Sequence, residues 1–359
     1  MDGSVLKIGD QLLINSQLID VENGFVLWSD QYDRKMKDIF ATQDEIAHNI
    51  THALKITLSP SEQQAIKAPA TEQFLAYDYY LRGWDFIYRF GPKNLNLARV
   101  MFQQAINSDS EYGPAWAGLA ISTAFLHIYY DPNPKLRPQC DQASLKALQH
   151  TPDLPESCIA RALALHINNQ FQDAEIYFQR SIELNPNRFE SYYCFARMRI
   201  HQGRHRQAIE LFEKAMEVEP DDYQSPLLLV GIYNGLGEHE KAHKVAQQGV
   251  EIAQSFLKLN PNDARALCLS SNAWVELGET EKARDWVLKA IKIDPEYPAT
   301  LYNAACFYTS QGEYDKALDV LEKILKPGTS LWTWIKHDDD FKALRTMDRY
   351  QHITDKFQK

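Results

Sequence analysis

Residues 239–243, His-Glu-Lys-Ala-His, match the pattern H-E-x-x-H that many zinc peptidases have on a helix. Histidines four positions apart share one helix face and can bind one metal ion, while the glutamate activates a metal-bound water. Such an enzyme also needs a third ligand, and residues 244–263 offer only Glu251 and Asp263 as acidic candidates. A metal-dependent hydrolase that uses this segment is therefore one interpretation of the chain.

Other residues of catalytic type lack a supporting pattern. His48 with His52 and His201 with His205 also lie four apart, and we interpret them as surface or packing histidines. No glycine-rich phosphate loop or nucleophile elbow occurs. The sequence thus predicts no catalytic residues, no metal and no cofactor. The cysteines are odd in number, widely spaced and without C-x-x-C, which favours a reducing compartment over a disulfide framework: Cys140, Cys158, Cys194, Cys268 and Cys306.

Composition limits the class of partner. The formal net charge is -10, and no stripe of lysine and arginine is present, which argues against nucleic acid. No apolar run approaches the roughly 20 residues that a membrane span requires. The first residues, 1–10, lack the layout of a signal peptide. We expect a cytoplasmic protein, or alternatively the periplasmic part of a membrane-anchored system.

The elements that position all these residues follow from an internal repeat. Ala174, Ala208 and Ala242 are 34 positions apart, as are Ala283 and Ala317. A glycine precedes most of these alanines and a proline usually follows the apolar stretch, so each unit has a turn, a closely packed helix and a stop. The turn glycines are Gly203, Gly237, Gly278 and Gly312.

This pattern resembles the tetratricopeptide repeat family, whose period is 34 residues. The resemblance implies pairs of antiparallel helices, A and B, stacked into an α-solenoid. We predict seven pairs, with helices A and B near 72–89 and 94–107, 113–127 and 135–149, 155–168 and 171–184, 189–202 and 205–218, 222–236 and 239–259, 263–277 and 280–293, and 297–311 and 314–326. The H-E-x-x-H segment then lies at a turn between helices, and the helix after it has seven extra residues.

The first 70 residues predict a small α+β unit. Apolar, β-favouring runs at 4–8, 11–21 and 25–32 are separated by hairpin signals, which indicates a three-stranded antiparallel sheet. Thr42-Gln43-Asp44-Glu45 matches a capping box, and an apolar stripe predicts a helix near 43–58 on the sheet. The residues from Ser59 to Thr71 predict a linker.

This segment is similar to the C-terminal half of the TolB-like domain that precedes repeat arrays in bacterial adenylate cyclase-associated and transcriptional-regulator proteins. The similarity includes Leu27-Trp28, Tyr32-Asp33-Arg34 and Asp38-Ile39-Phe40. The earlier part of that domain, and any cyclase or DNA-binding module, is absent from the sequence. Half a domain leaves an open sheet edge, so we expect the sheet to pair with a second copy in a homodimer or to pack on the solenoid.

The domain organisation predicted is a partial TolB-like unit and linker at 1–70, a solenoid at 71–328 and C-terminal capping helices at 329–359. The cap would use Trp332, Trp334, Phe341, Leu344 and Tyr350.

The family resemblance implies a concave surface that is lined by helix A and binds protein. Aromatic side chains supply buried area, whereas amides and guanidinium groups bond to a peptide backbone or carboxylate. The chain lacks the lysine and asparagine set of the carboxylate-clamp repeats. We therefore predict a non-enzymatic, regulatory interaction scaffold in bacterial signalling that binds a peptide or protein segment through Tyr80, Trp84, Tyr193, Arg197, Asn234, Arg265, Asn272 and Tyr302.

Overall fold

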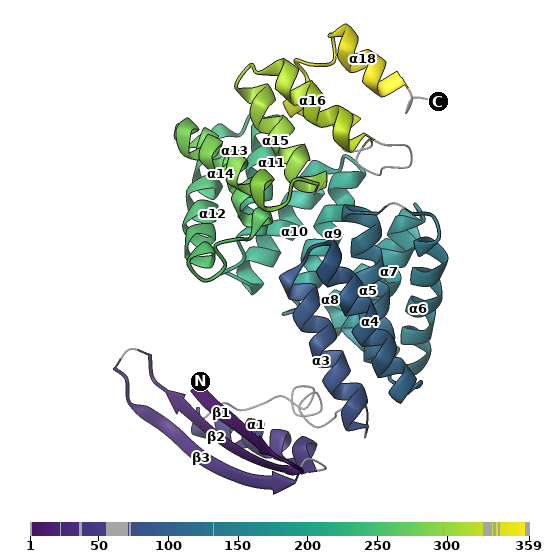
Figure 1. Cartoon of the computed structure of the whole chain (residues 1–359), viewed down its shortest axis with the longest axis vertical. Coiled ribbons are helices and arrows are strands. Elements are labelled where there is room, and N and C mark those ends of the chain that lie inside the picture. Colours follow the sequence, from purple (N-terminus) through teal and green to yellow (C-terminus); the bar gives the residue numbers. More distant parts are fainter. Residues whose placement is uncertain are drawn as a thin grey trace. The chain divides into compact units, whose positions relative to one another are not determined.

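The computed structural model describes residues 2–21, 23–35, 38–54, 71, 73–131, 133–296, 298–325, 332, 335–336 and 338–355. They form two compact units, one of Met1–Asp78 with Asn107–Ser110 and the other of Tyr79–Ile106 with Glu111–Lys359. The first unit contains a small sheet with a helix, and the second contains a stack of helix pairs (Figure 1). No helix among the described residues has the length and apolar composition needed to cross a bilayer.

The N-terminal sheet has three antiparallel strands in the order β1 (Asp2–Ile8), β2 (Gln11–Ile19) and β3 (Val26–Lys35). Gly9 and Gly24, in the two connections, have φ angles of 62° and 75°, a left-handed conformation that glycine adopts at little cost. The predicted three-stranded meander is confirmed.

Helix α1 (Ile39–Ala53) contacts β3 and covers part of one sheet face. Asn49 Nδ2 donates a hydrogen bond of 3.0 Å to the hydroxyl of Tyr32, which is buried together with Leu12. Every residue of β1 is exposed, so this strand is an uncovered edge.

The predicted capping box at the start of α1 is wrong. The helix begins four residues earlier than expected, at Ile39, so Thr42 lies inside it. The Thr42 side chain is buried, and its hydroxyl donates to the carbonyl of Asp38 at 2.9 Å instead of capping. Threonine makes this bond to the carbonyl four residues back when it is within a helix. The predicted end of the helix and most of the linker lie outside the described residues.

The described residues contain seven helix pairs, most of whose residues belong to the second unit, and the predicted helices differ from the observed ones by only a few residues at their ends. The pairs are α3 (Phe74–Arg89) and α4 (Pro92–Ser108), α5 (Gly113–Tyr129) and α6 (Leu136–His150), α7 (Pro155–Ile167) and α8 (Phe171–Leu184), α9 (Phe189–His201) and α10 (His205–Val218), α11 (Gln224–Gly235) and α12 (His239–Leu259), α13 (Ala264–Glu276) and α14 (Thr280–Ile293), and α15 (Pro298–Ser310) and α16 (Tyr314–Ile324). The first helix of each pair is called helix A below, and the second helix B.

The repeating alanines and glycines have the roles that their spacing predicts. Each of the five repeating alanines is fully buried in its helix B, where a larger side chain would separate the helices. The four turn glycines have φ angles between 70° and 79°. Asn169 has the equivalent position in the third pair with φ 60°, and asparagine tolerates this conformation better than most residues.

One apolar core extends through the stack from Trp84 to Ile353. A 3-10 turn, η2 (Asp339–Phe341), and the short helix α18 (Asp348–Thr354) follow the last pair. Phe341 and Leu344 are fully buried in this core, so the C-terminal segment covers apolar surface that the last pair would otherwise expose. Trp334 lies outside the described residues. The predicted domain boundaries at 70/71 and 328/329 adjoin or lie within stretches outside the described residues and stay predictions.

Candidate binding groove

A groove with a volume of about 670 Å³ is lined mainly by A helices and by the loops that precede them. The end of α3 and the second half of α5 contribute aromatic and aliphatic side chains. The loops before α9, α11 and α13 contribute most of the polar ones. The lining includes Trp84, Tyr88, Phe90, Phe125, Tyr129, Arg188, Phe189, Glu190, Tyr193, Glu219, Asp221, Asp222, Tyr223, Phe256, Asp263 and Arg265.

The aromatic wall combines a buried ring with an exposed one. Trp84 is nearly buried, whereas Tyr88, one helical turn later on α3, is 69% exposed, and the two ring centroids are 5.8 Å apart. Phe189 and Tyr193, also one turn apart, stack on α9 at 5.3 Å. Rings of this kind give a ligand a large apolar contact area at low entropic cost.

Arg188 lies on the same wall between two carboxylates. Its guanidinium is 5.7 Å from the Trp84 ring centroid, 2.9 Å from Glu156 and 2.7 Å from Glu190. Burial opposes charge here, but the two glutamates raise the pKa of Arg188 above its usual value. Arg188 is therefore a charged and positioned residue of the wall.

Arg265, at the start of α13, forms a closed set of hydrogen bonds with two other A helices. It donates to Gln224 Oε1 at 2.9 Å and to the Tyr193 hydroxyl at 2.8 Å, and Tyr193 donates to Gln224 at 3.1 Å. Burial raises the pKa of Tyr193, so this hydroxyl remains protonated at neutral pH. The three side chains fix the relative positions of α9, α11 and α13 at the floor of the groove.

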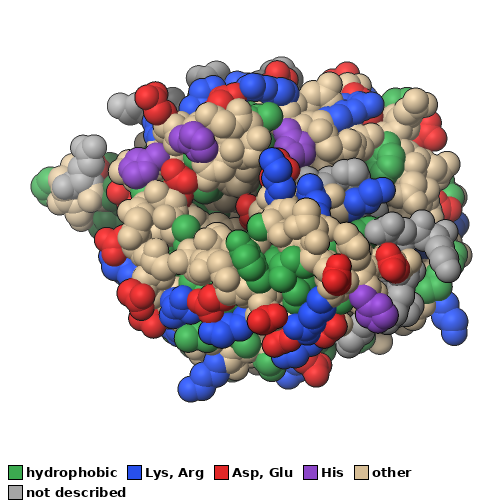
Figure 2. Space-filling view, turned by 90° about the horizontal axis from the view of Figure 1, so that it is seen from above, with side chains coloured by type: hydrophobic (Ala, Val, Ile, Leu, Met, Phe, Trp, Pro, Cys, Tyr) green, Lys and Arg blue, Asp and Glu red, His purple; other side chains and the backbone are tan. Residues whose placement is uncertain are grey.

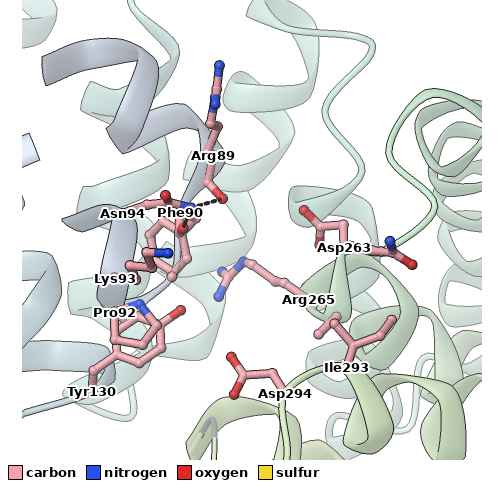
Figure 3. A pocket seen from close by; sticks show the side chains of 13 residues that line it. Arg89, Phe90, Pro92, Lys93, Asn94, Tyr130, Asp263, Arg265, Ile293 and Asp294 are labelled. Atoms are coloured by element: carbon pink, nitrogen blue, oxygen red, sulfur yellow. Dashed lines mark hydrogen bonds between the residues drawn. The ribbon is translucent and has the colours of Figure 1, made fainter. Parts of the chain in front are cut away.

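Arg265 also reaches the first and second helix pairs. Its guanidinium is 5.1 Å from the ring centroid of Phe90 and 5.4 Å from that of Tyr129. Figure 3 shows this side chain extending from α13 toward Phe90, beside a second cavity of about 310 Å³. Phe90 has φ 50° in the turn after α3, where Asn94 Nδ2 donates to its carbonyl at 2.6 Å. The superhelical turn thus brings the first pair against the sixth.

Five of the predicted site residues line cavities of the solenoid. Trp84, Tyr193 and Arg265 line the groove. Arg197 and Tyr302 line, together with Arg265, a neighbouring cavity of about 50 Å³, where Arg197 lies 5.3 Å from the Tyr129 ring centroid.

The other three predicted residues are elsewhere. Tyr80 packs against the core, 6.1 Å from the Phe102 ring centroid. Asn234 donates to Glu276 at 2.7 Å near the turn between α11 and α12. Asn272 lines none of the three cavities described for this chain. A common binding role for all eight residues stays a prediction.

The sequence analysis missed the loop residues and Phe256. Phe256 belongs to the predicted extension of α12, which is 21 residues long, and its ring lies 5.0 Å from that of Tyr223 on the groove wall. The seven-residue insertion was the signal for it. Glu219 and Asp221 are in the loop before α11, a region that the repeat pattern explains as a stop and a cap, so its sequence pointed to no binding role.

The H-E-x-x-H segment forms the first turn of α12 and does not favour a hydrolase. His239 Nδ1 lies 3.0 Å from Asn234 Oδ1, and the half-exposed His243 is 4.0 Å from Glu276. Asp263, a candidate third ligand, accepts a hydrogen bond from the backbone N–H of Ala266 at 2.7 Å and so caps α13.

Potential metal ligands come together at one place among the described residues, and it includes neither histidine. Cys306, Asp338 and Asp340 have ligand atoms within 4.8 Å of one another, where the C-terminal segment meets α15. The hydroxyl of Tyr302 donates to Asp338, and Arg345 donates to the carbonyl of the same residue at 2.6 Å. The first bond attaches the C-terminal segment to the last pair, and the second lies within that segment.

Surface charge is mixed on the face shown in Figure 2, where Lys and Arg side chains are interspersed with Asp and Glu. In this view the described residues show no broad basic area.

Models of the tetratricopeptide repeat match residues 155–188, 177–210, 199–256, 244–298 and 286–319. Together with the stacked helix pairs, these matches show that the chain contains tetratricopeptide repeats between residues 155 and 319. Arrays of this class generally act as scaffolds for protein interaction. The TolB-like resemblance of the N-terminal unit stays a prediction.

Several known proteins are similar to this chain. Putative adenylate cyclase 3 of Rhizobium meliloti (strain 1021) is 31% identical over 177 residues, which are 49% of this chain and 30% of that protein. The Protein CTR9 homolog of Arabidopsis thaliana is 25% identical over 229 residues, 61% of this chain and 20% of the relative. The chain thus spans less than a third of either relative. A solved structure of a human IFIT1 dimer with m7Gppp-AAAA has a TM-score of 0.52 at 18% identity, covering 85% of this chain and 68% of that one, and shows a similar fold.

Proposed function

We propose that this chain is a non-enzymatic scaffold that binds a segment of another protein in the groove between α3, α5, α9 and α13. The observation that supports this proposal is the aromatic lining of the groove. An exposed ring, Tyr88, stands beside the nearly buried Trp84 in a space large enough for several side chains. Aromatic anchors surrounded by polar groups are typical of the centre of a protein interface.

Peptides selected from a random library displayed on phage, with the whole chain as the target, test this proposal. Tyr88→Ala should raise the dissociation constants of the selected peptides by roughly tenfold or more, because truncation of an aromatic anchor weakens binding by about this much. Tyr88 is largely exposed, so its removal should leave the fold intact.

Ile176→Ala is the matched control, because Ile176 is 62% exposed on the B helix α8 and lines none of the three cavities. Equal affinity of Tyr88→Ala and Ile176→Ala for every selected peptide, or failure to select any peptide, would count against the groove.

We also propose a regulatory role in bacterial signalling, in the cytoplasm. Its support is the similarity to the putative adenylate cyclase of Rhizobium meliloti. Cross-linking in bacterial cells followed by mass spectrometry should recover a signalling protein, and recovery of metabolic enzymes alone would contradict this role.

A homodimer through the N-terminal sheet is a second proposal, supported by the exposed edge strand. Val5, Leu6 and Ile8 on β1 are between 53% and 68% exposed, and the outward N–H and C=O groups of an edge strand can pair with a second copy. Sedimentation at high micromolar concentration should show a dimer that Leu6→Lys dissociates. A wild-type monomer at that concentration would remove the proposal.

A further inference from the structure

The groove wall has an excess of negative charge. Five carboxylates line it, against the guanidinium groups of Arg188 and Arg265. Arg188 already contacts Glu156 and Glu190, and Arg265 bonds to Tyr193 and Gln224. The cations of the groove are therefore engaged with the protein itself.

Two of the carboxylates have a structural role. Asp263 accepts the backbone N–H of Ala266 at 2.7 Å, and Asp222 accepts that of Ser225 at 2.8 Å. Both carboxylates satisfy N–H groups at the first turn of an A helix, where negative charge also interacts favourably with the helix dipole. Helix capping is thus sufficient to explain Asp222 and Asp263.

Glu219 and Asp221 have no such explanation. Both are exposed in the loop between α10 and α11, and their carboxylates accept no hydrogen bond and form no ion pair within the described part of the chain. Because charges that the fold does not use remain available to a ligand, these two side chains define an acidic rim.

A second feature of the groove is the aromatic surface beside the acidic rim. The Trp84 ring, which is 8% exposed, lines the same cavity as Glu219 and Asp221. One bound segment can therefore place apolar side chains on the rings and cationic side chains at the rim.

We infer that the segment bound in this groove is a basic peptide, with lysine or arginine beside apolar side chains; this inference rests on the proposed function. The apolar side chains contact Trp84 and Phe125 in the groove. The cationic side chains reach Glu219 and Asp221, and the face of Tyr88 offers them a cation–π contact. Negative potential at the rim favours the approach of such a segment and disfavours an acidic one.

The random-library selection also tests this inference. Selected peptides should contain more lysine and arginine than the unselected library, and their affinity should fall with added salt. The double variant Glu219→Lys/Asp221→Lys should weaken binding roughly tenfold or more at low salt. The control Glu281→Lys/Asp285→Lys makes the same change in net charge at exposed positions of α14, outside the three cavities, and should leave binding within about twofold of wild type.

The outcomes separate the two proposals. Neutral or acidic peptides that lose affinity with Tyr88→Ala but not with the rim reversal would overturn the inference and keep the groove as the binding site. Equal weakening by the rim and control reversals would also overturn it, because net charge alone would then account for the effect. Peptides whose affinity changes with neither Tyr88→Ala nor the rim reversal would contradict the proposal that the groove is the binding site.

Discussion

Substitution of Gly118 by alanine should destabilise the first two helix pairs, although alanine is the better helix former. Gly118 on α5 and Gly83 on α3 both face the ring of Phe102, which is fully buried. A Cβ at Gly118 would lie 2.3 Å from Phe102 Cε1 and 2.4 Å from Cζ. Ordinary contact begins at 3.4 Å, so the ring or the helix has to move by about 1 Å.

The expected magnitude is the sum of two opposing effects. Overpacking of a filled core costs about 1–3 kcal/mol, and replacement of a helical glycine by alanine returns up to about 1 kcal/mol. Displacement of a ring held between two helices belongs at the upper end, so we expect a net loss of about 2 kcal/mol. Gly231 on α11 is the matched control, because a Cβ there meets nothing within 4 Å. Gly231→Ala should stabilise the protein by about 0.5–1 kcal/mol.

Urea denaturation followed by far-ultraviolet circular dichroism measures both variants. Gly118→Ala should shift the midpoint to lower urea, and the shift should be smaller when Phe102→Leu is present than the sum of the two single effects, since the residues share one contact. A Gly118→Ala midpoint at or above that of wild type would refute the reasoning. So would strict additivity with Phe102→Leu.

Two other predictions follow from buried titratable groups. His166 Nε2 lies 3.0 Å from His201 Nδ1, and burial, with His201 and Arg197 nearby, lowers the pKa of His166 to about 3. As the pH falls, the unfolded chain binds this proton before the folded chain does. The free energy of unfolding is therefore highest above pH 6.5 and is lower by about 2 kcal/mol at pH 5. His166→Gln should reduce this dependence of the unfolding free energy on pH in urea titrations, and an unchanged dependence would contradict the assignment. All five cysteines are free and buried, and burial raises the pKa of thiols such as Cys140 and Cys194. Ellman's reagent should therefore label none of them in the native protein and all of them in urea, and rapid native labelling would show that the pairs open locally.

The helix pairs could be predicted because residues within the repeat units mark the turn between helices and the end of the unit. A glycine fixes the turn, an alanine fixes the close contact and a proline usually ends the unit, as at Gly203, Ala208 and Pro220. These requirements are local, so 34-residue spacing is enough to find them. The predicted start of α1 was wrong because residue type alone does not decide whether a threonine caps a helix. Thr42 has a side chain suited to a cap, but its hydroxyl donates to a carbonyl within the helix region instead.

The groove could be predicted only in part. Trp84, Tyr193 and Arg265 were expected because they lie on A helices, which line the concave side in this family. The contact between Phe90 and Arg265 depends on the angles between successive helix pairs, because these angles add up over the five interfaces from the first pair to the sixth. A repeat length says nothing about that angle, and side-chain packing at each interface sets it.

The contact between Phe90 and Arg265 has a mechanical consequence. An open stack of repeats can be extended elastically, because each repeat contacts only its neighbours. Here the guanidinium–ring contact joins two repeats that are distant in the stack. Widening the cavity therefore requires this contact to break as well as the stack of repeats to bend. The spacing of the walls is therefore set before any ligand arrives.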